Sequence, residues 1–331
     1  MFNWAVIGTG GIADRFTSVL TSSRVSGCEA YGQLRGVLAT SESKARDFIV
    51  KHQGAACAGA ISYDDISALI ADAEIDAVYI ATPHTSHYDF TRQLLMAQKP
   101  VLCEKPLTVT AAETQHLIEL ARHNKVFLME ALWTKTLPVW HRVKQLLKQG
   151  EIGEVDHFSA DMGFYFPYDS THRLFNRELA GGILLDMGVY PISLANWLAG
   201  VPIDITASSV FSDQGVDLKT MVNMRFDKQL TASFTLSTKS TTENAFWIYG
   251  EDGWIRVDDL FSESQGLTYQ IAGQTTKESY PFEINGFEYQ IAEVVKCVSE
   301  GIIEHENVTH QNTLEVMTIV DRIREQIGLQ Y

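Results

Sequence analysis

Residues 4–13 read Trp-Ala-Val-Ile-Gly-Thr-Gly-Gly-Ile-Ala, and this stretch decides the fold. The apolar start predicts a buried strand, and the glycines predict the tight turn through which it enters a helix reaching about Leu20. Gly8, Gly10 and Ala13 have the spacing of the dinucleotide fingerprint, in which backbone N–H groups approach a pyrophosphate at a helix N-terminus. The sequence therefore predicts a cofactor-binding turn made of Gly8, Thr9, Gly10, Gly11 and Ile12.

Two other interpretations of this turn are weaker. A glycine-rich turn without any ligand is one, but its place in the first strand-helix unit argues for binding. A methyltransferase would use a similar loop, yet it would carry an acidic residue just before the first glycine, where this chain has Ile7.

The rest of the chain falls into two patterns. Up to about residue 125, short β-rich runs alternate with amphipathic helices, which predicts a doubly wound parallel sheet. Beyond it, long β-rich segments, several of which alternate polar and apolar residues, predict a large, mostly antiparallel open sheet. We therefore expect an α/β Rossmann domain over residues 1–125 and an α+β domain for substrate binding and oligomerisation over residues 126–331.

Composition excludes several classes of partner. The chain has 331 residues, 45% of them hydrophobic and 20% charged, as in a folded globular protein. Its net charge of −15 would repel nucleic acid and anionic membranes, so we expect a small-molecule substrate. The four cysteines form no C-x-x-C pair, so no metal site is predicted. No leader segment and no apolar run of membrane length is evident, so we expect a cytoplasmic protein.

The residues after the second predicted strand bear on the choice of cofactor. An acidic side chain there would hydrogen-bond the ribose of NAD and repel the 2′-phosphate of NADP. This chain has Thr40 and Ser41 instead, followed by Glu42, and Lys44 offers positive charge. The pattern favours NADP over NAD.

The segment Thr82-Pro83-His84-Thr85-Ser86-His87 follows the strand that ends at Ile80. Two histidines three residues apart suggest a metal, but no carboxylate or cysteine is spaced to join them. We expect Thr82, Pro83 and His87 to contact the cofactor, with His87 lining the nicotinamide end of the cleft.

The segment Cys103-Glu104-Lys105-Pro106-Leu107 supplies the candidate acid/base. It follows an apolar strand, and ligands of open parallel sheets collect outside the carboxyl ends of the strands. A partly desolvated lysine there can lose its proton near neutral pH. The plainer interpretation is a solvated Glu-Lys pair, but the position favours catalysis by Lys105, with Glu104 and Lys105 also contacting the cofactor.

The segment Asp186-Met187-Gly188-Val189-Tyr190 is the third candidate. Residues four apart lie on one face of a helix, so the Asp186 carboxylate and the Tyr190 hydroxyl can point into one cavity, with Gly188 leaving space between them. Taken alone, the segment is as well explained by a capping aspartate and a half-buried tyrosine.

Five stretches together resemble the Gfo/Idh/MocA oxidoreductases, which include glucose-fructose oxidoreductase and inositol dehydrogenases. The stretches are 8–13, 80–87, 104–107, 129–133 and 181–191, and the resemblance extends along essentially the whole chain. It implies that Lys105 is the catalytic lysine, that a cis bond precedes Pro106 and that Asp186 binds substrate beside the lysine. It also implies that Trp133 and Arg177 border the same cleft.

Many members of this family carry histidine four residues after the aspartate, where this chain has Tyr190. In this it is similar to the branch of dimeric dihydrodiol dehydrogenase and NADP-dependent xylose dehydrogenase, whose tyrosine is thought to share the proton transfer. Ser41 stands where that branch often has arginine, which leaves the cofactor open between NADP and NAD.

The activity we expect is hydride transfer between nicotinamide and a hydroxyl or carbonyl carbon of a sugar, polyol or cyclic trans-diol. Two alternatives remain open, a glycosidase or lyase that uses NAD without net redox change and a nucleotide-binding sensor without turnover. We also expect a homodimer or larger homo-oligomer built on the open sheet face, whose strands alternate apolar residues such as Phe234 and Phe246 with residues of the opposite face.

Overall fold

The structure, a computed structural model, describes residues 1–22, 30–52, 57 and 59–331. The chain divides into two units. The first comprises Met1–Thr108, Ala112–Trp133 and Phe282–His310, and the second comprises Val109–Ala111, Thr134–Pro281 and Gln311–Tyr331. A late segment of the sequence thus belongs to the first unit. Cys57, Cys103 and Cys297 are buried free thiols, and Cys28 lies outside the described residues.

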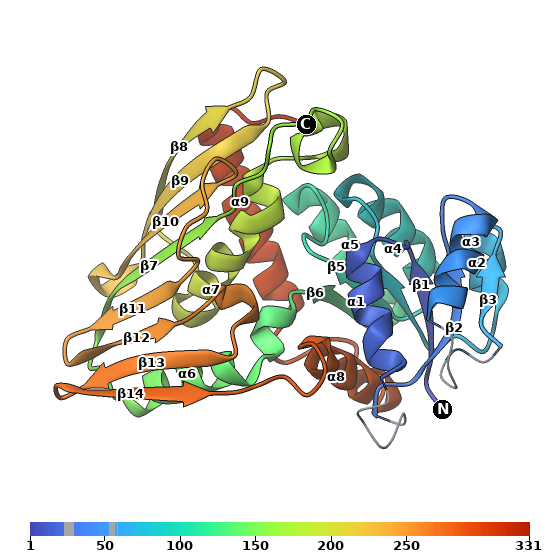
Figure 1. The fold of residues 1–331 in the computed structure, drawn as a ribbon, viewed down its shortest axis with the longest axis horizontal. Helices are drawn as coiled ribbons and strands as arrows, with labels where there is room; N and C mark the ends of the chain where they lie inside the picture. The colour runs from blue at the N-terminus through green and yellow to red at the C-terminus, as the bar shows by residue number, and fades with distance from the viewer. Residues whose placement is uncertain (23–29, 53–56, 58) are drawn as a thin grey trace. The chain divides into compact units, whose positions relative to one another are not determined.

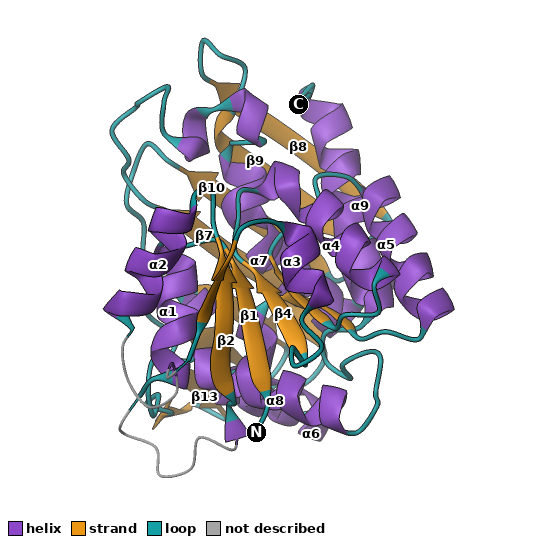
Figure 2. Cartoon of the chain, turned by 90° about the vertical axis from the view of Figure 1, so that its right-hand side faces the viewer, coloured by secondary structure: helices purple, strands orange, loops and turns teal. Residues whose placement is uncertain are grey.

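The first unit contains a six-stranded parallel sheet in the order β3-β2-β1-β4-β5-β6. Its strands are β1 (Asn3–Ile7), β2 (Gln33–Leu38), β3 (Ile61–Tyr63), β4 (Ala77–Ile80), β5 (Val101–Glu104) and β6 (Leu128–Ala131). Its helices are α1 (Gly11–Leu20), α2 (Glu42–Lys51), α3 (Ile66–Ala71), α4 (His87–Met96), α5 (Ala111–Asn124) and α8 (Phe287–Ser299). Figure 2 shows the strands between α1 and α2 on one side and α3, α4 and α5 on the other.

The sheet forms because its strands are apolar on both faces. The side chains of Val6, Val78 and Leu102 are fully buried, as expected for a parallel sheet covered by helices on both sides. The strand order reverses between β1 and β4, and the carboxyl ends of these two strands form the switch point where such folds bind ligands. The turn after β1 and the segments after β4 and β5 therefore emerge at one edge.

The second unit contains an eight-stranded sheet in the order β14-β13-β12-β11-β7-β10-β9-β8. Its strands are β7 (Val155–Gly163), β8 (Asp204–Phe211), β9 (Asp217–Arg225), β10 (Thr231–Ser237), β11 (Phe246–Gly250), β12 (Gly253–Val257), β13 (Gly266–Ile271) and β14 (Gln274–Ser279). Only β7 and β10 pair in parallel, and the other pairs are antiparallel. Helices α6 (Pro138–Gln149), α7 (Val189–Ala199) and α9 (His310–Ile327) lie along one face (Figure 1).

The alternation of apolar and polar residues along these strands explains why the helices cover one face of the sheet. Phe158, Phe234, Phe246 and Ile248 are buried on the face that the helices cover, and the residues between them point to the opposite face. The predicted fold class, a parallel Rossmann sheet followed by a large, mostly antiparallel sheet, is confirmed.

One helical stretch of the described chain, Arg177–Ala199, is long and apolar enough to be compared with a membrane span. The sequence-based expectation that the chain has no apolar run of this length was wrong for this stretch. In its most apolar window, 78% of the residues are buried inside the protein, which is how the core helix of a globular unit behaves.

Candidate functional site

The turn after β1 has the geometry of a dinucleotide cradle. Gly8 has a φ of +108°, and a Cβ there would lie 2.4 Å from the carbonyl oxygen of Ala81, so only glycine fits. At Gly10 and Gly11 a Cβ would meet nothing within 4 Å. Gly8 is therefore required by the packing of β1 against β4, whereas Gly10 and Gly11 face open space at the N-terminus of α1. Exposed N–H groups at a helix start suit a pyrophosphate.

Thr40 and Ser41 follow β2 at the same edge, and both are exposed. Ser41 caps α2, since its Oγ accepts a hydrogen bond from the backbone N–H of Lys44 at 3.3 Å. The Lys44 ammonium donates to Thr40 Oγ1 at 3.1 Å. These contacts place a cation beside two neutral hydroxyls, which suits a phosphate better than an acidic side chain would.

Glu104, the last residue of β5, is a buried carboxyl group. The Tyr79 hydroxyl donates to its Oε1 at 2.5 Å, and the Lys105 backbone N–H donates to its Oε2 at 3.3 Å. Burial raises the pKa of Glu104 to about 7, against the opposing effects of the Tyr79 hydrogen bond and the Lys105 charge. The side chain of Lys105 is half-buried next to it, and the Lys105–Pro106 bond is cis, as the resemblance implied.

His87, the first residue of α4, is fully buried. Its Nδ1 lies 2.8 Å from the carbonyl oxygen of Pro106, and its Nε2 lies 2.8 Å from that of Thr82. Burial, helped by the Lys105 charge, lowers the pKa of His87 against the opposing effect of the two carbonyl oxygens. Where we expected a side chain lining a cleft, the imidazole instead joins the segment after β4 to the segment after β5 from inside. Pro83 precedes it in an exposed position.

Trp133 is buried, and it is the last residue of the segment Ala112–Trp133 of the first unit. The guanidinium of Arg15 lies 4.6 Å from its ring centroid, and the ring of Phe287 lies 4.8 Å away. Within the first unit, this indole therefore packs between α1 and α8.

Asp186 lies in the second unit, in a π turn at Leu184–Gly188 that continues into α7. Its carboxylate, 7% exposed, is gripped by the half-exposed Arg173, whose Nη1 and Nη2 donate at 3.0 and 3.3 Å. A two-point contact of this kind fixes the carboxylate orientation. Tyr190 follows four residues later and is half-buried.

Sequence reasoning named Arg177 and placed substrate contacts on the loop from Tyr165 to Arg173, but it gave Arg173 no role of its own. Arg177 is exposed, and its Nε donates to the carbonyl oxygen of Gln330 at 2.9 Å. Arg173 belongs to an irregular segment without periodicity, so the only available signal was a second arginine thirteen residues before Asp186.

Asp217 holds the start of the helix that carries Asp186. Its Oδ2 accepts hydrogen bonds from the Leu184 backbone N–H at 2.9 Å and from Thr220 Oγ1 at 2.8 Å. Burial raises the pKa of Asp217 to about 6. Gly182 leaves room for this carboxylate, since a Cβ there would lie 2.0 Å from Asp217 Oδ1.

Gly188 has a different role from the one expected. A Cβ at Gly188 would lie 2.7 Å from a methyl group of Leu236 in β10. The glycine thus allows the helix to pack against the sheet, and this packing, rather than space between Asp186 and Tyr190, requires it. A π turn adds one residue to a helical turn and occurs often at functional sites.

The fold and these groups define a protein of the Rossmann dehydrogenase class, and comparison with known proteins identifies the family. Residues 2–132 match the Gfo/Idh/MocA oxidoreductase family with its NAD-binding Rossmann fold, and residues 140–256 match the C-terminal domain of that family. The chain belongs to this family. The resemblance and the oxidoreductase class expected from the sequence are confirmed.

Individual relatives align along almost the whole chain. Trans-1,2-dihydrobenzene-1,2-diol dehydrogenase of Danio rerio is 32% identical over 99% of this chain and 97% of its own length. D-xylose 1-dehydrogenase (NADP(+)) of Hypocrea jecorina is 30% identical over 99% of this chain and 92% of its own length. A 3-ketoreductase from Actinomadura kijaniata, solved with NADP and TDP-benzene, has a TM-score of 0.85 at 23% identity and covers 98% of both chains, which shows the shared fold.

Proposed function

We propose that this protein is an NADP-dependent dehydrogenase or reductase that transfers a hydride between nicotinamide C4 and a carbinol carbon of a sugar, polyol or cyclic diol. The observation that carries the proposal is the half-buried Lys105, beside a buried carboxyl group at the edge where the Gly8 turn emerges. The names of the relatives, one a xylose dehydrogenase and one a diol dehydrogenase, support this class of substrate.

Each group has a distinct task in this proposal. The bound nicotinamide supplies the hydride chemistry. In oxidation, neutral Lys105 accepts the proton of the substrate hydroxyl, and in reduction its ammonium returns that proton to the carbonyl oxygen. Asp186, oriented by Arg173, accepts a hydrogen bond from a substrate hydroxyl, and Tyr190 shares the proton transfer.

The preference for NADP rests on the end of β2. Thr40 and Ser41 offer hydroxyl groups, and Lys44 adds a positive charge next to them. No acidic side chain occupies the two positions that would repel a 2′-phosphate, and the xylose dehydrogenase relative is named for NADP(+).

The test is a panel of aldoses, inositols and trans-diols, each offered with NADP+ and with NAD+, with the absorbance of reduced nicotinamide followed over time. We expect turnover with at least one CH–OH substrate and a higher kcat/KM with NADP+. Lys105→Met provides the matched inactive control. Tightly held cofactor that co-purifies, together with product formation without net reduction of nicotinamide, would replace the proposal with the non-redox alternative.

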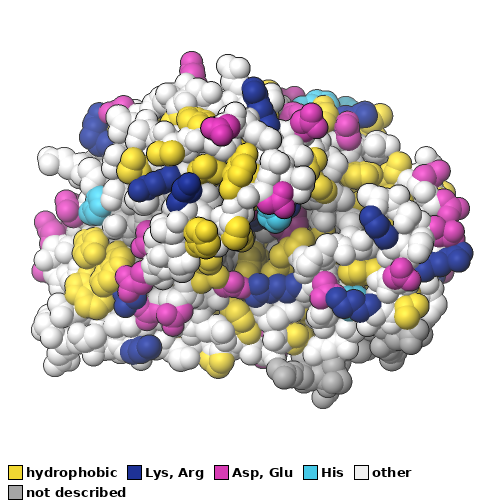
Figure 3. Space-filling view, turned by 45° about the horizontal axis from the view of Figure 1, so that its top comes forward, with side chains coloured by type: hydrophobic (Ala, Val, Ile, Leu, Met, Phe, Trp, Pro, Cys, Tyr) yellow, Lys and Arg dark blue, Asp and Glu magenta, His cyan; other side chains and the backbone are white. Residues whose placement is uncertain are grey.

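The assembly and location we propose are a cytoplasmic homodimer formed through the sheet face opposite the helices. Trp247 stacks on Tyr249 with ring centroids 5.6 Å apart and contacts Trp254 at 5.2 Å, all on this face. Met221 and Tyr249 are 40% and 37% exposed there, and Figure 3 shows hydrophobic side chains gathered at the left of the view. An apolar surface of this kind favours association.

Light scattering coupled to size exclusion at micromolar protein tests the assembly. We expect a mass of at least twice 37.0 kDa. A monomeric mass at that concentration would refute the dimer.

A further inference from the structure

Among the residues that the structure describes, the His87 imidazole faces two hydrogen-bond acceptors and no donor. Nδ1 lies 2.8 Å from the Pro106 carbonyl oxygen, and Nε2 lies 2.8 Å from the Thr82 carbonyl oxygen. The ring is fully buried, so water does not stand in for either partner. Both contacts lie within the first unit, and both carbonyls belong to segments at the ligand-binding edge of the sheet.

A neutral imidazole has one N–H and one lone pair, and only an imidazolium donates from both nitrogens. With a neutral ring, one carbonyl oxygen would face a nitrogen lone pair at hydrogen-bond distance in a dry environment. Burial, the largest effect, and the Lys105 charge together lower the pKa of His87 and so disfavour the cation. The geometry opposes this shift, because no neutral tautomer donates to both oxygens, whereas the cation would make two charge-assisted hydrogen bonds.

The charged and titratable surroundings of this ring are few. Lys105 acts on it from the segment after β5, and the ring of His84 lies with its centroid 5.8 Å away on the short helix before α4. Among the described residues, the hydrogen-bond partners of the ring are backbone oxygens rather than carboxylates. The carboxyl group closest to Lys105 in the chain, Glu104, is held by Tyr79 instead.

We propose that His87 is held as an imidazolium that fastens Thr82 to Pro106, positions Lys105 and places a positive charge next to its ammonium. Like charges in a low-dielectric site disfavour one another, so the imidazolium favours the neutral form of Lys105. That form is the one that accepts a proton from a substrate hydroxyl. His87 is a positioning residue, and only the consequence for Lys105 rests on the proposed function.

The first experiment is independent of turnover. The ring nitrogen chemical shifts of 15N-histidine-labelled protein are recorded between pH 6 and 8 and assigned by comparison with His87→Gln. We expect both His87 nitrogens to show the shifts of protonated imidazolium across this range. His141, whose Nε2 faces a single carbonyl oxygen at 2.9 Å, serves as the internal reference. An unprotonated nitrogen signal from His87 at pH 7 would overturn the proposal, whether or not the protein oxidises any substrate.

The second experiment measures the pH dependence of kcat in His87→Gln, with His116→Gln as control. His116 is exposed on α5, and its Nδ1 contacts the Tyr88 hydroxyl. Its substitution should therefore leave the pH profile of kcat unchanged. In the oxidation direction, kcat rises with pH as Lys105 loses its proton. Loss of the charge at His87 should move this rise to higher pH by about one unit, so that kcat at pH values below it falls roughly tenfold. A purely structural role would lower kcat without moving this rise, and that result would contradict the electrostatic part. Should His87→Gln not fold, the spectra of the parent protein, assigned by other means, decide the ionisation state.

Discussion

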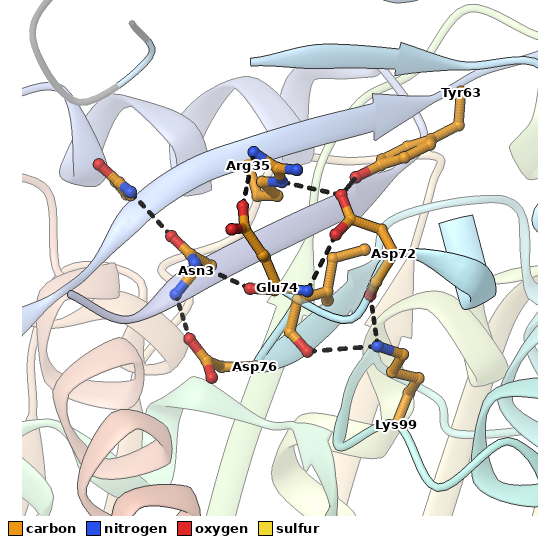
Figure 4. Close-up of polar contacts among 9 residues, drawn as sticks. Asn3, Arg35, Tyr63, Asp72, Glu74, Asp76 and Lys99 are labelled. Carbon is orange, nitrogen blue, oxygen red and sulfur yellow. Dashed lines mark hydrogen bonds and ion pairs between the residues drawn. The ribbon is translucent and has the colours of Figure 1, made fainter. Parts of the chain in front are cut away.

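The charged groups at the two edges of the parallel sheet differ in their surroundings. At the amino edge, Arg35 donates to Asp72 at 2.8 Å and contacts Glu74 at 3.0 Å, and Tyr63 donates to the same Asp72 oxygen (Figure 4). The Lys99 ammonium donates to the Asp72 carbonyl at 2.6 Å. Each ionised group there has an opposite or complementary partner, as in a structural network.

At the carboxyl edge, burial shifts the pKa values of two titratable groups. Glu104 has a pKa raised to about 7, and His87 faces two acceptors. The polar groups at the amino edge are paired with one another, whereas the buried groups at the carboxyl edge lie within the electrostatic reach of Lys105. Strongly perturbed groups gather at functional sites.

The largest expected effect comes from Lys105→Met compared with Lys99→Met. Removing the acid/base should lower kcat by roughly 10²–10⁴-fold while the Kd for NADPH stays near that of the parent. Lys99→Met should lower the melting temperature and leave kcat intact, because its ammonium serves backbone carbonyls at the amino edge. Steady-state kinetics and NADPH fluorescence titration provide both numbers. A Lys105→Met enzyme that keeps more than about a tenth of kcat would remove the lysine from this role.

Glu104→Gln should change how stability depends on pH. With its pKa raised to about 7, Glu104 holds a proton in the folded protein that it loses near pH ~4.3 in the unfolded chain. The free energy of unfolding should therefore fall as pH rises from about 4 to 7, by roughly 3 kcal/mol from this group. The variant should lack that decline. The free energies of unfolding come from denaturant titrations at each pH. If they change with pH in the same way in parent and variant, Glu104 is ionised throughout and the prediction is wrong.

Asp72→Asn should cost about 1–3 kcal/mol of stability with no loss of kcat. The neutral amide loses the charge that pairs with Arg35, and its NH2 group replaces one of the two oxygens that accept from Arg35, Tyr63 and the Glu74 backbone N–H. Burial raises the pKa of Asp72, but hydrogen bonds from Arg35, the Glu74 backbone and Tyr63 together outweigh it and lower the pKa. Its contribution is thus present above pH ~4 and is lost as pH falls through the lowered folded-state pKa. Urea unfolding at pH 7 and pH 3 measures this. A difference between parent and variant that persists unchanged at pH 3 contradicts the assignment.

Ser41→Asp should have the smallest effect, a reduction of about tenfold in the preference for NADP over NAD, from repulsion of the 2′-phosphate. The ratio of kcat/KM for the two cofactors on one substrate reports it. Ser43→Asp is the matched control, because Ser43 is exposed and lies two residues after Ser41, within the first turn of α2. Equal ratios in the two variants would mean that net charge, rather than position, controls the cofactor.

Much of the fold was predictable because buried strands and helices repeat apolar residues at regular spacing in the sequence. The apolar runs of β1, β4 and β5 and the alternation in β7 and β10 indicated both sheets. The hairpin of β13 and β14 was missed, since Gln274–Ser279 is polar throughout and has no apolar face. The assignment of α8 to the first unit was equally invisible, because it depends on contacts between residues distant in the chain.

The candidate site was predictable where it follows strand ends. Lys105, Glu104 and the glycine turn are placed by β5 and β1, and their positions follow from parallel topology. Arg173 was not predictable, because it reaches Asp186 from an irregular segment. The burial of His87 was not predictable either, since a histidine at a helix start carries no sequence signal for the depth of its ring.

The most direct test of the account is a single turnover with substrate deuterated at the carbinol carbon, in the presence of NADP+. Mass spectrometry of the recovered cofactor should find one deuterium in NADPH, at C4, and an oxidised carbonyl product, and Lys105→Met should slow this transfer by roughly 10²–10⁴-fold. Deuterium that stays in or returns to the product while the cofactor ends oxidised and unlabelled would contradict hydride transfer as the net reaction.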